Sequence, residues 1–200
     1  MPIAGEPAVQ KSAQSLADKA LMQGVSSSES TALEALMKRY WSRLVTYAST
    51  LTENEDAAED VVQDTFVRVW QHRERWVPSG TVGAYLYRIT RNLAINARRD
   101  LQAQRIREER GGTELKGSLT VANPEQDTEA AELRREILAA IAELPVRRRE
   151  VFMLSRFHGM SYDEIADAME LSPRTVANHM SAALADLRSL LRHHLASDPR

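Results

Sequence analysis

The sequence predicts an all-α protein made of two small helical domains joined by a flexible linker. From Ser30 onward, apolar residues recur every three or four positions, which is the period of an amphipathic helix. No segment alternates apolar and polar residues with the period of two expected of a half-buried strand. The helical period is lost over residues 101–128 and returns at about Glu129. We therefore expect one domain at residues 29–100 and a second at 129–195.

The N-terminal half should hold a tail followed by three helices. Residues 1–28 are rich in Ala, Ser, Gln and Gly, so we expect a disordered or frayed tail with at most a short helix near Leu16–Met22. Beyond it, apolar stripes at helical spacing predict three amphipathic helices, with stripes over Leu33 to Tyr47, Ala58 to Trp70 and Leu86 to Ala97.

Polar and helix-breaking residues mark the ends of these helices. Thr52 or Asn54 can cap the second helix, and acidic residues follow in its first turn. The segment Val77–Gly80 contains Pro and Gly and predicts a loop. The third helix should then run from about Val82 to Arg99.

The second half begins with the linker at 101–128, where charge runs and glycines predict flexible chain, with helix allowed only at its start. A helix should follow and stop before Pro145. Another should cover Arg147–His158 and end at Gly159. The last stretch predicts two more helices separated by a short turn.

Composition and charge narrow the function classes. The chain has no cysteine, which excludes disulfides, thiolate catalysis and cysteine-ligated zinc. No apolar run is long enough for a signal peptide or a membrane span, so we expect a cytoplasmic protein without membrane insertion. The net charge is only −2, but charges cluster, with acid at Glu53–Asp64 and base at Arg88–Arg110 and Arg147–Arg149. This alternation predicts different faces for different partners.

The strongest motif lies near the C-terminus. Ser161 and Glu164 have the spacing of a capping box, and Ser172 followed by Pro173 predicts the start of a second helix after a short turn. With the small Ala166 where the helices approach, this is a helix-turn-helix pattern, whose second helix lies in the major groove of DNA. The residues that it would present are Ser172, Arg174, Thr175, Asn178, His179 and Ser181.

The chemistry of that second helix suits base readout. Arg174 matches guanine, Asn178 matches adenine, and Ser or Thr can reach phosphate. The alternative is a plain αα-hairpin with a polar exposed face. The preceding Arg147, Arg148 and Arg149 are candidates for phosphate contacts, or else an ordinary solvated run.

These motifs resemble a known family. The C-terminal half resembles region 4 of sigma factors over Leu144–Phe152, Gly159–Ala166 and Ser172–Val176. The N-terminal half independently resembles region 2 over Asp56–Phe66, Val69–Trp70 and Tyr85–Ala94. With no region between those two domains, the plan resembles the extracytoplasmic-function (ECF) group of the RNA polymerase sigma factors of the sigma-70 family.

The resemblance implies a protein that binds core RNA polymerase, through its β′ and β subunits, and recognises the −35 and −10 elements of promoter DNA. It implies no catalytic residues, cofactor or metal. The helix that would dock on the β′ subunit carries Glu59, Asp60, Gln63, Asp64 and Arg68 on an outer face. A merely solvated acidic face is the alternative for these residues.

Promoter melting needs surfaces for a base removed from the duplex and cations for the exposed strand. The candidates for contact with the −10 single strand are Trp76, Tyr85, Tyr87, Arg88, Arg91, Asn92, Asn96, Arg98 and Arg99. Trp41 and Trp70 are expected in the core instead. The family often has Trp where Tyr85 stands, and many members are basic where this chain has Ala177 and Ala182, which leaves more phosphate contact to the arginines at 147–149.

The resemblance also implies capture by an anti-sigma factor. Such a partner could clamp or separate two domains joined by a polar linker at little cost in strain. It would cover the acidic face around Asp60 and Asp64 and an apolar flank of the C-terminal domain.

Two other interpretations share single features with this sequence. A transcriptional regulator of the response-regulator output type also often carries a Thr-Val-x-Asn-His sequence, as Thr175–His179 does here, but its receiver domain would show alternating strands and helices. An enzyme with Glu59, Asp60 and Asp64 as metal ligands lacks an accompanying histidine, since His72 is two turns away.

Overall fold

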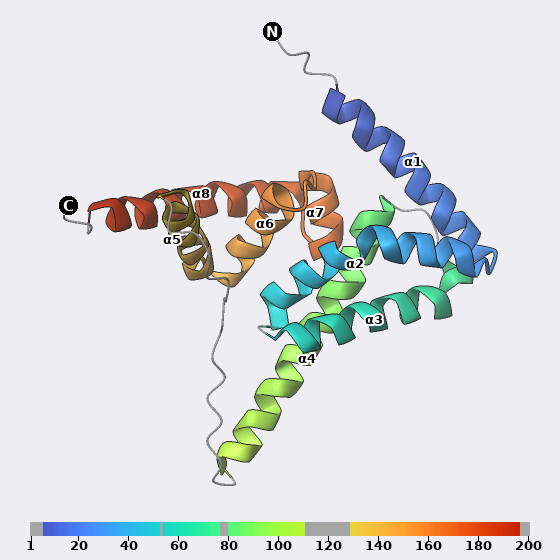
Figure 1. The fold of residues 1–200 in the computed structure, drawn as a ribbon, viewed down its shortest axis with the longest axis horizontal. Coiled ribbons are helices and arrows are strands. Elements are labelled where there is room, and N and C mark those ends of the chain that lie inside the picture. Colours follow the sequence, from blue (N-terminus) through green and yellow to red (C-terminus); the bar gives the residue numbers. More distant parts are fainter. Residues whose placement is uncertain (1–5, 53, 77–79, 111–128, 197–200) are drawn as a thin grey trace. The chain divides into compact units, whose positions relative to one another are not determined.

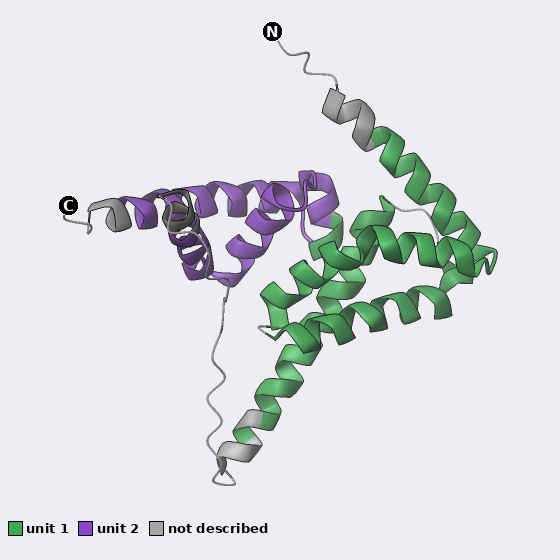
Figure 2. Ribbon diagram, in the orientation of Figure 1, with its two compact units in different colours: residues 1–117, 167–169 green, residues 118–166, 170–200 purple. Residues whose placement is uncertain are grey.

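The computed structural model describes residues 6–52, 54–76, 80–110 and 129–196 (Figure 1). This described part is helical and contains no strand, so the all-α expectation is confirmed. Contacts divide the chain into two compact units, residues 1–117 with 167–169 and residues 118–166 with 170–200 (Figure 2).

The first unit is built from α1 (Glu6–Ser26), α2 (Ser30–Thr52), α3 (Glu55–Gln71), a short 3₁₀ turn η1 (Arg73–Arg75) and α4 (Val82–Arg110). Helix α2 packs against α1, α3 and α4, and α3 also packs against α4. Side chains cap two of these helices: Asn54 Oδ1 accepts from the Ala57 N–H at 3.0 Å, and Thr81 Oγ1 accepts from the Ala84 N–H at 3.2 Å.

The expectation of a frayed tail is wrong over residues 6–26, which form a helix. Helix α1 occupies this segment, and Met22 and Val25 are fully buried. Asp18 is also buried, and two side chains of α2 donate hydrogen bonds to its carboxylate. The Ala- and Ser-rich composition suggested a tail, but the three-residue step from Met22 to Val25 already marks a buried helical face.

Helix α4 is longer than expected, since it ends at Arg110 instead of about Arg99. Residues 101–110, the start of the predicted linker where helix was allowed, continue α4. Their sequence consists mainly of strong helix formers, and the first glycine comes only at Gly111. The remainder of the predicted linker, 111–128, lies outside the described residues.

Aromatic and hydroxyl side chains join the helices of the first unit. The rings of Tyr47 and Tyr87 meet edge to face, with centroids 5.1 Å apart. The hydroxyls of Thr65 and Thr90 lie 3.1 Å apart between α3 and α4.

The predicted core tryptophans, Trp41 and Trp70, are only half-buried, because each lies at the edge of its helix's apolar stripe. The Trp41 ring stacks on Phe66.

The second unit is built from α5 (Glu129–Glu143), α6 (Val146–Arg156), α7 (Tyr162–Met169, apart from residues 167–169 at its end) and α8 (Pro173–Ala196). Its core holds Ala140, Ile141, Leu144, Ala183 and Leu187. As predicted, α5 ends before Pro145. Gly159 has a φ of +67°, and the Met160 N–H donates to the Leu154 carbonyl at 3.1 Å, which closes the end of α6.

Helices long and apolar enough to cross a bilayer are absent from the described ranges.

Stability should fall at alkaline pH because of buried tyrosines. Burial raises the pKa of Tyr87 to about 12, although nearby Arg43 opposes the shift, and burial also raises the pKa of Tyr40. An unfolded tyrosine loses its proton near pH 10, so this stability is fully present below about pH 10 and is lost as the pH rises towards 12. Between the unfolded and folded pKa values, each tyrosine can lower the free energy of unfolding by up to about 1.4 kcal/mol per pH unit.

Urea unfolding of the protein and of its Tyr87→Phe variant between pH 9 and about pH 12 checks this expectation. The variant should lose less stability over this range than the parent. Equal losses would show that Tyr87 titrates as it does in the unfolded chain.

Candidate nucleic-acid interface

The predicted capping box is present at the start of α7. The Ser161 Oγ accepts from the Glu164 N–H at 3.3 Å, and the Glu164 carboxylate accepts from the Ser161 N–H at 2.7 Å. Helix α7 ends at Met169; the capping residue Glu170 is left-handed with φ +56°, and the Leu171 N–H donates back to the Ala166 carbonyl at 2.9 Å. These contacts define a short turn between α7 and α8.

Helix α8 begins at Pro173 behind the Ser172 cap. Ser172 Oγ accepts from the Thr175 N–H at 3.1 Å and lies 2.8 Å from the Thr175 hydroxyl. Two predictions for this turn are thus confirmed: Ser172 caps the helix and Pro173 takes its first position.

The two faces of α8 differ in chemistry. The buried face carries Val176, Met180, Ala183 and Leu187. Among the predicted base-reading residues, Ser172, Arg174, Asn178 and Ser181 are exposed, while Thr175 and His179 are half-buried. Because Arg174, Asn178 and Ser181 follow at steps of four and three, they share one exposed stripe.

The three arginines at the start of α6 have different surroundings. Arg147 is exposed and lies 3.9 Å from the buried Glu150 carboxylate. Arg148 pairs with Asp186 of α8 at 2.6 Å. Arg149 donates to the carbonyls of Ala142 and Leu144 at the end of α5. Arg148 and Arg149 therefore join helices of the second unit, which leaves Arg147 as the most accessible candidate for a phosphate contact.

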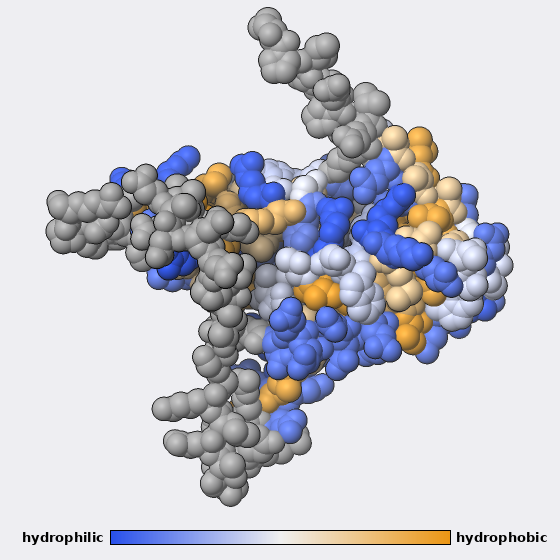
Figure 3. All heavy atoms as spheres, viewed as in Figure 1, coloured by the Kyte–Doolittle hydropathy of each residue, from blue (hydrophilic) through white to orange (hydrophobic). Residues whose placement is uncertain are grey.

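The acidic face predicted on α3 is exposed. Val61, Val62, Phe66 and Val69 are buried on the opposite side. Every residue predicted for the polymerase contact is solvent-exposed: Glu59, Asp60, Gln63, Asp64 and Arg68. Val67 lies among them with 44% of its surface exposed. Hydrophilic side chains dominate the visible surface where α3 lies (Figure 3).

Helix α4 presents a polar stripe that contains most of the predicted single-strand contacts. We call Tyr85, Arg88, Asn92, Asn96 and Arg99 the α4 stripe, because steps of three and four residues place them on one face. The two asparagines and Arg99 are exposed, and Tyr85 and Arg88 are half-buried. Arg99 donates to the Asn96 side chain at 2.5 Å, and Arg98 is exposed beside the stripe.

Two of the residues predicted for the −10 strand are buried. Tyr87 is 1% exposed and Arg91 is 5% exposed. They lie four residues apart on the face that also carries Leu86, Thr90 and Ala94, so helical spacing turns both towards the core. The expectation that they contact a DNA strand is therefore corrected.

Aromatic residues lie on both sides of the loop that precedes α4. Trp76 is half-buried at the end of η1, and Tyr85 is half-buried in the first turn of α4. The Arg88 guanidinium lies 5.8 Å from the centre of the Tyr85 ring. Burial raises the pKa of Tyr85, against the opposing effect of Arg88. Residues 77–79 of the predicted loop lie outside the described residues.

The second unit also exposes apolar side chains. Helix α5 exposes Ile137 and Leu138, and Phe157 after α6 is 54% exposed while its ring contacts Phe152. Leu190 and Leu191 of α8 are partly buried against the core. We call Ile137, Leu138, Phe152, Phe157, Leu190 and Leu191 the apolar flank.

In the part of the chain that the structure describes, no three His, Asp or Glu residues are grouped so that they could hold a metal ion. That includes the α3 carboxylates at 59, 60 and 64.

Comparison with protein families matches both halves of the chain. Residues 36–104 match the family model described as Sigma-70 region 2, and residues 134–187 match the model described as Sigma-70, region 4.

Individual proteins are similar along most of their length. The ECF RNA polymerase sigma factor SigL of Mycobacterium tuberculosis is 31% identical over 174 residues, which cover 86% of this chain and 96% of SigL. The RNA polymerase sigma factor CnrH of Cupriavidus metallidurans is 31% identical over 184 residues, covering 88% of this chain and 94% of CnrH. A solved structure of CnrH in complex with the cytosolic domain of CnrY has a TM-score of 0.65 at 26% identity and covers 88% of this chain and 98% of that one.

Proposed function

We propose that this chain, which belongs to the ECF sigma factors of the sigma-70 family, binds core RNA polymerase through α3 and positions promoter DNA through α4 and α8. Its role is that of a transcription initiation factor. In this proposal it works in the cytoplasm and by binding alone, while the polymerase supplies the chemistry.

The observation that carries the detailed proposal is the α4 stripe. It combines an aromatic ring, amides and guanidinium groups along one helix face, which are the groups that stack on bases and neutralise phosphates of a single strand. A regulator that reads only duplex DNA has no use for such a face. The stripe belongs to the unit that matches sigma-70 region 2, and the helix-turn-helix belongs to the match with region 4.

The division of labour follows from the two kinds of surface. Arg174, Asn178 and Ser181 of α8 would read the −35 element in the major groove, with Arg147 on a phosphate. The α4 stripe, Trp76 and Arg98 would hold the −10 strand. The α3 residues would dock on the polymerase β′ subunit, and the second unit on the β subunit.

A helix-turn-helix regulator of the response-regulator type is not favoured. Its receiver domain would need alternating strands and helices. The described residues of the first unit are helical instead.

The test is run-off transcription with core polymerase on a library of genomic promoter fragments. We expect discrete transcripts from a small set of promoters only when both the protein and core polymerase are present. A library on which the protein never changes the transcripts made by core polymerase would refute the proposal.

Capture by an anti-sigma factor is a second proposal, supported by CnrH, whose structure was solved in complex with the cytosolic domain of CnrY. The apolar flank offers an exposed apolar surface on the second unit, and the acidic face of α3 offers a polar one on the first. A partner that covers both would block docking on polymerase. The chain has no cysteine, so a redox signal would have to enter through that partner.

Co-expression with the product of the adjacent gene should therefore yield a complex and silence transcription. Replacing Phe157 with Ser in the apolar flank should weaken the complex, because its ring is largely exposed and available for burial. Pull-down and run-off transcription measure the two effects. A protein that stays fully active in the cell under all conditions, with no partner recovered, would contradict capture and leave the sigma-factor role intact.

A further inference from the structure

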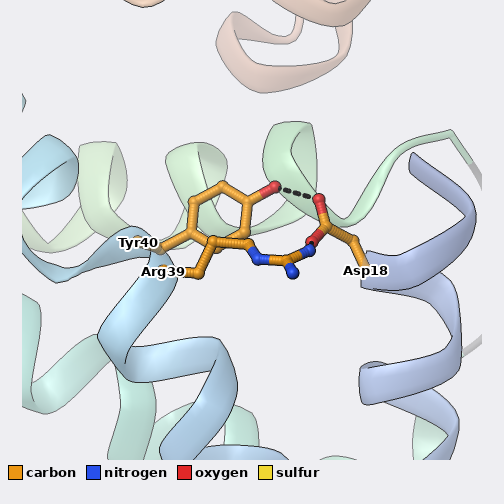
Figure 4. A network of polar contacts seen from close by, with 3 residues as sticks. All are labelled: Asp18, Arg39 and Tyr40. Atoms are coloured by element: carbon orange, nitrogen blue, oxygen red, sulfur yellow. Dashed lines mark hydrogen bonds and ion pairs between the residues drawn. The ribbon is translucent and has the colours of Figure 1, made fainter. Parts of the chain in front are cut away.

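Helix α1 carries a buried polar cluster that the functions above do not use. Asp18 is 4% exposed and accepts hydrogen bonds from Arg39 at 2.5 Å and from the Tyr40 hydroxyl at 2.6 Å (Figure 4). Burial and the bond to Asp18 raise the pKa of Tyr40, so its hydroxyl stays protonated and acts as the donor. A buried carboxylate held by two donors fixes the position of both partners. We call Asp18, Arg39 and Tyr40 the Asp18 cluster.

The Tyr40 side chain is in turn the support for the first turn of α4. A Cβ atom placed on Gly83 would lie 3.2 Å from the Tyr40 hydroxyl oxygen and 3.6 Å from its Cε1. The backbone of α4 thus approaches Tyr40 so closely that a side chain at Gly83 would press on the Tyr40 hydroxyl. Val82 and Ala84 on either side are buried. The position of Tyr40 therefore helps to set where α4 begins and where Tyr85, two residues later, stands.

The other side of the loop is tied to the same helices. Arg73 of η1 donates to the Ser28 hydroxyl in the turn between α1 and α2 at 2.9 Å, and to the Trp70 carbonyl at 2.8 Å. Its guanidinium also lies 4.6 Å from the centre of the Trp70 ring. The Trp76 N–H donates to the Arg73 carbonyl at 3.5 Å. Trp76 is therefore connected through Arg73 to the turn that follows α1.

Helix α1 therefore contacts the element before the loop and the element after it, since it packs against η1 and against α4. A site for an unpaired base needs its stacking groups held to within roughly half an ångström. Trp76 and Tyr85 lie on separate elements. A third element that contacts both can therefore supply this positional precision.

We propose that α1, through the Asp18 cluster and the Ser28–Arg73 contact, is a brace that positions Trp76 and Tyr85 for the unpaired −10 base. Asp18, Tyr40 and Arg73 are then positioning residues, because they act through other side chains and do not touch DNA. This inference rests on the proposed role of Trp76 and Tyr85 in the −10 contact.

The test compares holoenzymes on fork-junction DNA from a responsive promoter. The −10 single strand is either intact or carries an abasic site, placed in turn at each position. For the wild-type protein, the ratio of the two affinities measures the contribution of each base. Tyr40→Phe removes only the donor hydroxyl and should lower the ratio at one or two positions by roughly three- to tenfold. Affinity for core polymerase and for the abasic fork should stay within about twofold, because α3 and the phosphate contacts are untouched.

Three further variants sharpen the test. Asp18→Asn should lower the same ratio, and so should Arg73→Gln, which acts from the other side of the loop. Gly83→Ala should do so as well, and combining it with Tyr40→Phe should restore part of the ratio, because the lost hydroxyl leaves room for the new methyl group. Glu34→Gln, an exposed acid on α2, is the charge-matched control and should change nothing.

The outcomes separate the two proposals. If the wild-type protein binds intact and abasic forks equally, the proposed −10 contact itself is wrong. If the wild type discriminates and Tyr40→Phe and Arg73→Gln discriminate equally well, the brace is refuted and the −10 contact stands. A parallel loss on intact and abasic forks also refutes the brace, since it shows a general weakening of the fold.

Discussion

Reversing two charges on α3, with Asp60→Lys and Asp64→Lys together, should lower the affinity for core RNA polymerase by roughly 100-fold, equivalent to about 3 kcal/mol. Both carboxylates are exposed and lie one helical turn apart, so they can meet the same basic surface of a partner. Like charges placed in a complementary interface repel each other and slow association as well. Titration of labelled protein with core polymerase gives the affinity, and run-off transcription should fall with it.

The control for this prediction is a variant with the same change in net charge. Glu34→Lys with Glu143→Lys alters two exposed acids outside α3 and should leave the affinity for core polymerase near that of the parent. Both variants should unfold at similar temperatures, because exposed substitutions of this kind change stability by only about 0.5 kcal/mol. Equal affinity of the two variants for polymerase would remove α3 from the docking surface.

Replacing Arg174 or Asn178 with Ala should reduce discrimination at the −35 element by about 1–3 kcal/mol per residue. Both side chains are exposed on the α8 stripe, where a bidentate contact to a base is lost without disturbing the core. Affinity for core polymerase should not change. Competition between the natural −35 sequence and single-base substitutions, measured with holoenzyme, should show relaxed preference at one base pair for each variant.

Arg188→Ala is the matched control, because it removes an exposed arginine from the same helix about 21 Å further along its axis. It should lower discrimination at no base pair. If both Arg174→Ala and Asn178→Ala kept the wild-type promoter preference, α8 would not be the helix that reads the −35 element.

The helices and their faces were largely predictable because apolar spacing is a local property of the sequence. The capping box at Ser161 and the Pro173 start of α8 follow from short-range hydrogen bonding and backbone geometry, and both were predicted correctly. The same holds for the exposed acids of α3, which lie opposite a regular apolar stripe.

The errors arose where the outcome depends on contacts between distant residues. Tyr85 and Tyr87 look alike in sequence, but only the structure shows that Tyr87 packs on Tyr47 while Tyr85 remains half-buried. Arg148 looks like a free cation and instead pairs with Asp186 of α8, 38 residues further along the chain. Residues 1–28 looked like a tail, because the sequence does not show that Asp18 accepts hydrogen bonds from Arg39 and Tyr40 of α2. Residue type predicts which chemistry is available, and tertiary packing decides which side chains can use it.

The most direct test of the central claim is the affinity of the protein for a responsive promoter duplex, measured by fluorescence anisotropy at physiological salt with and without core polymerase. The net charge of −2 and the few exposed base-reading side chains of a single helix should make the free protein bind DNA weakly. We predict weak binding, with little sequence preference, by the free protein, and tight, sequence-specific binding that proceeds to an open complex once core polymerase is added. Tight and specific binding by the isolated protein, unchanged by core polymerase, would contradict the account and identify a conventional DNA-binding regulator.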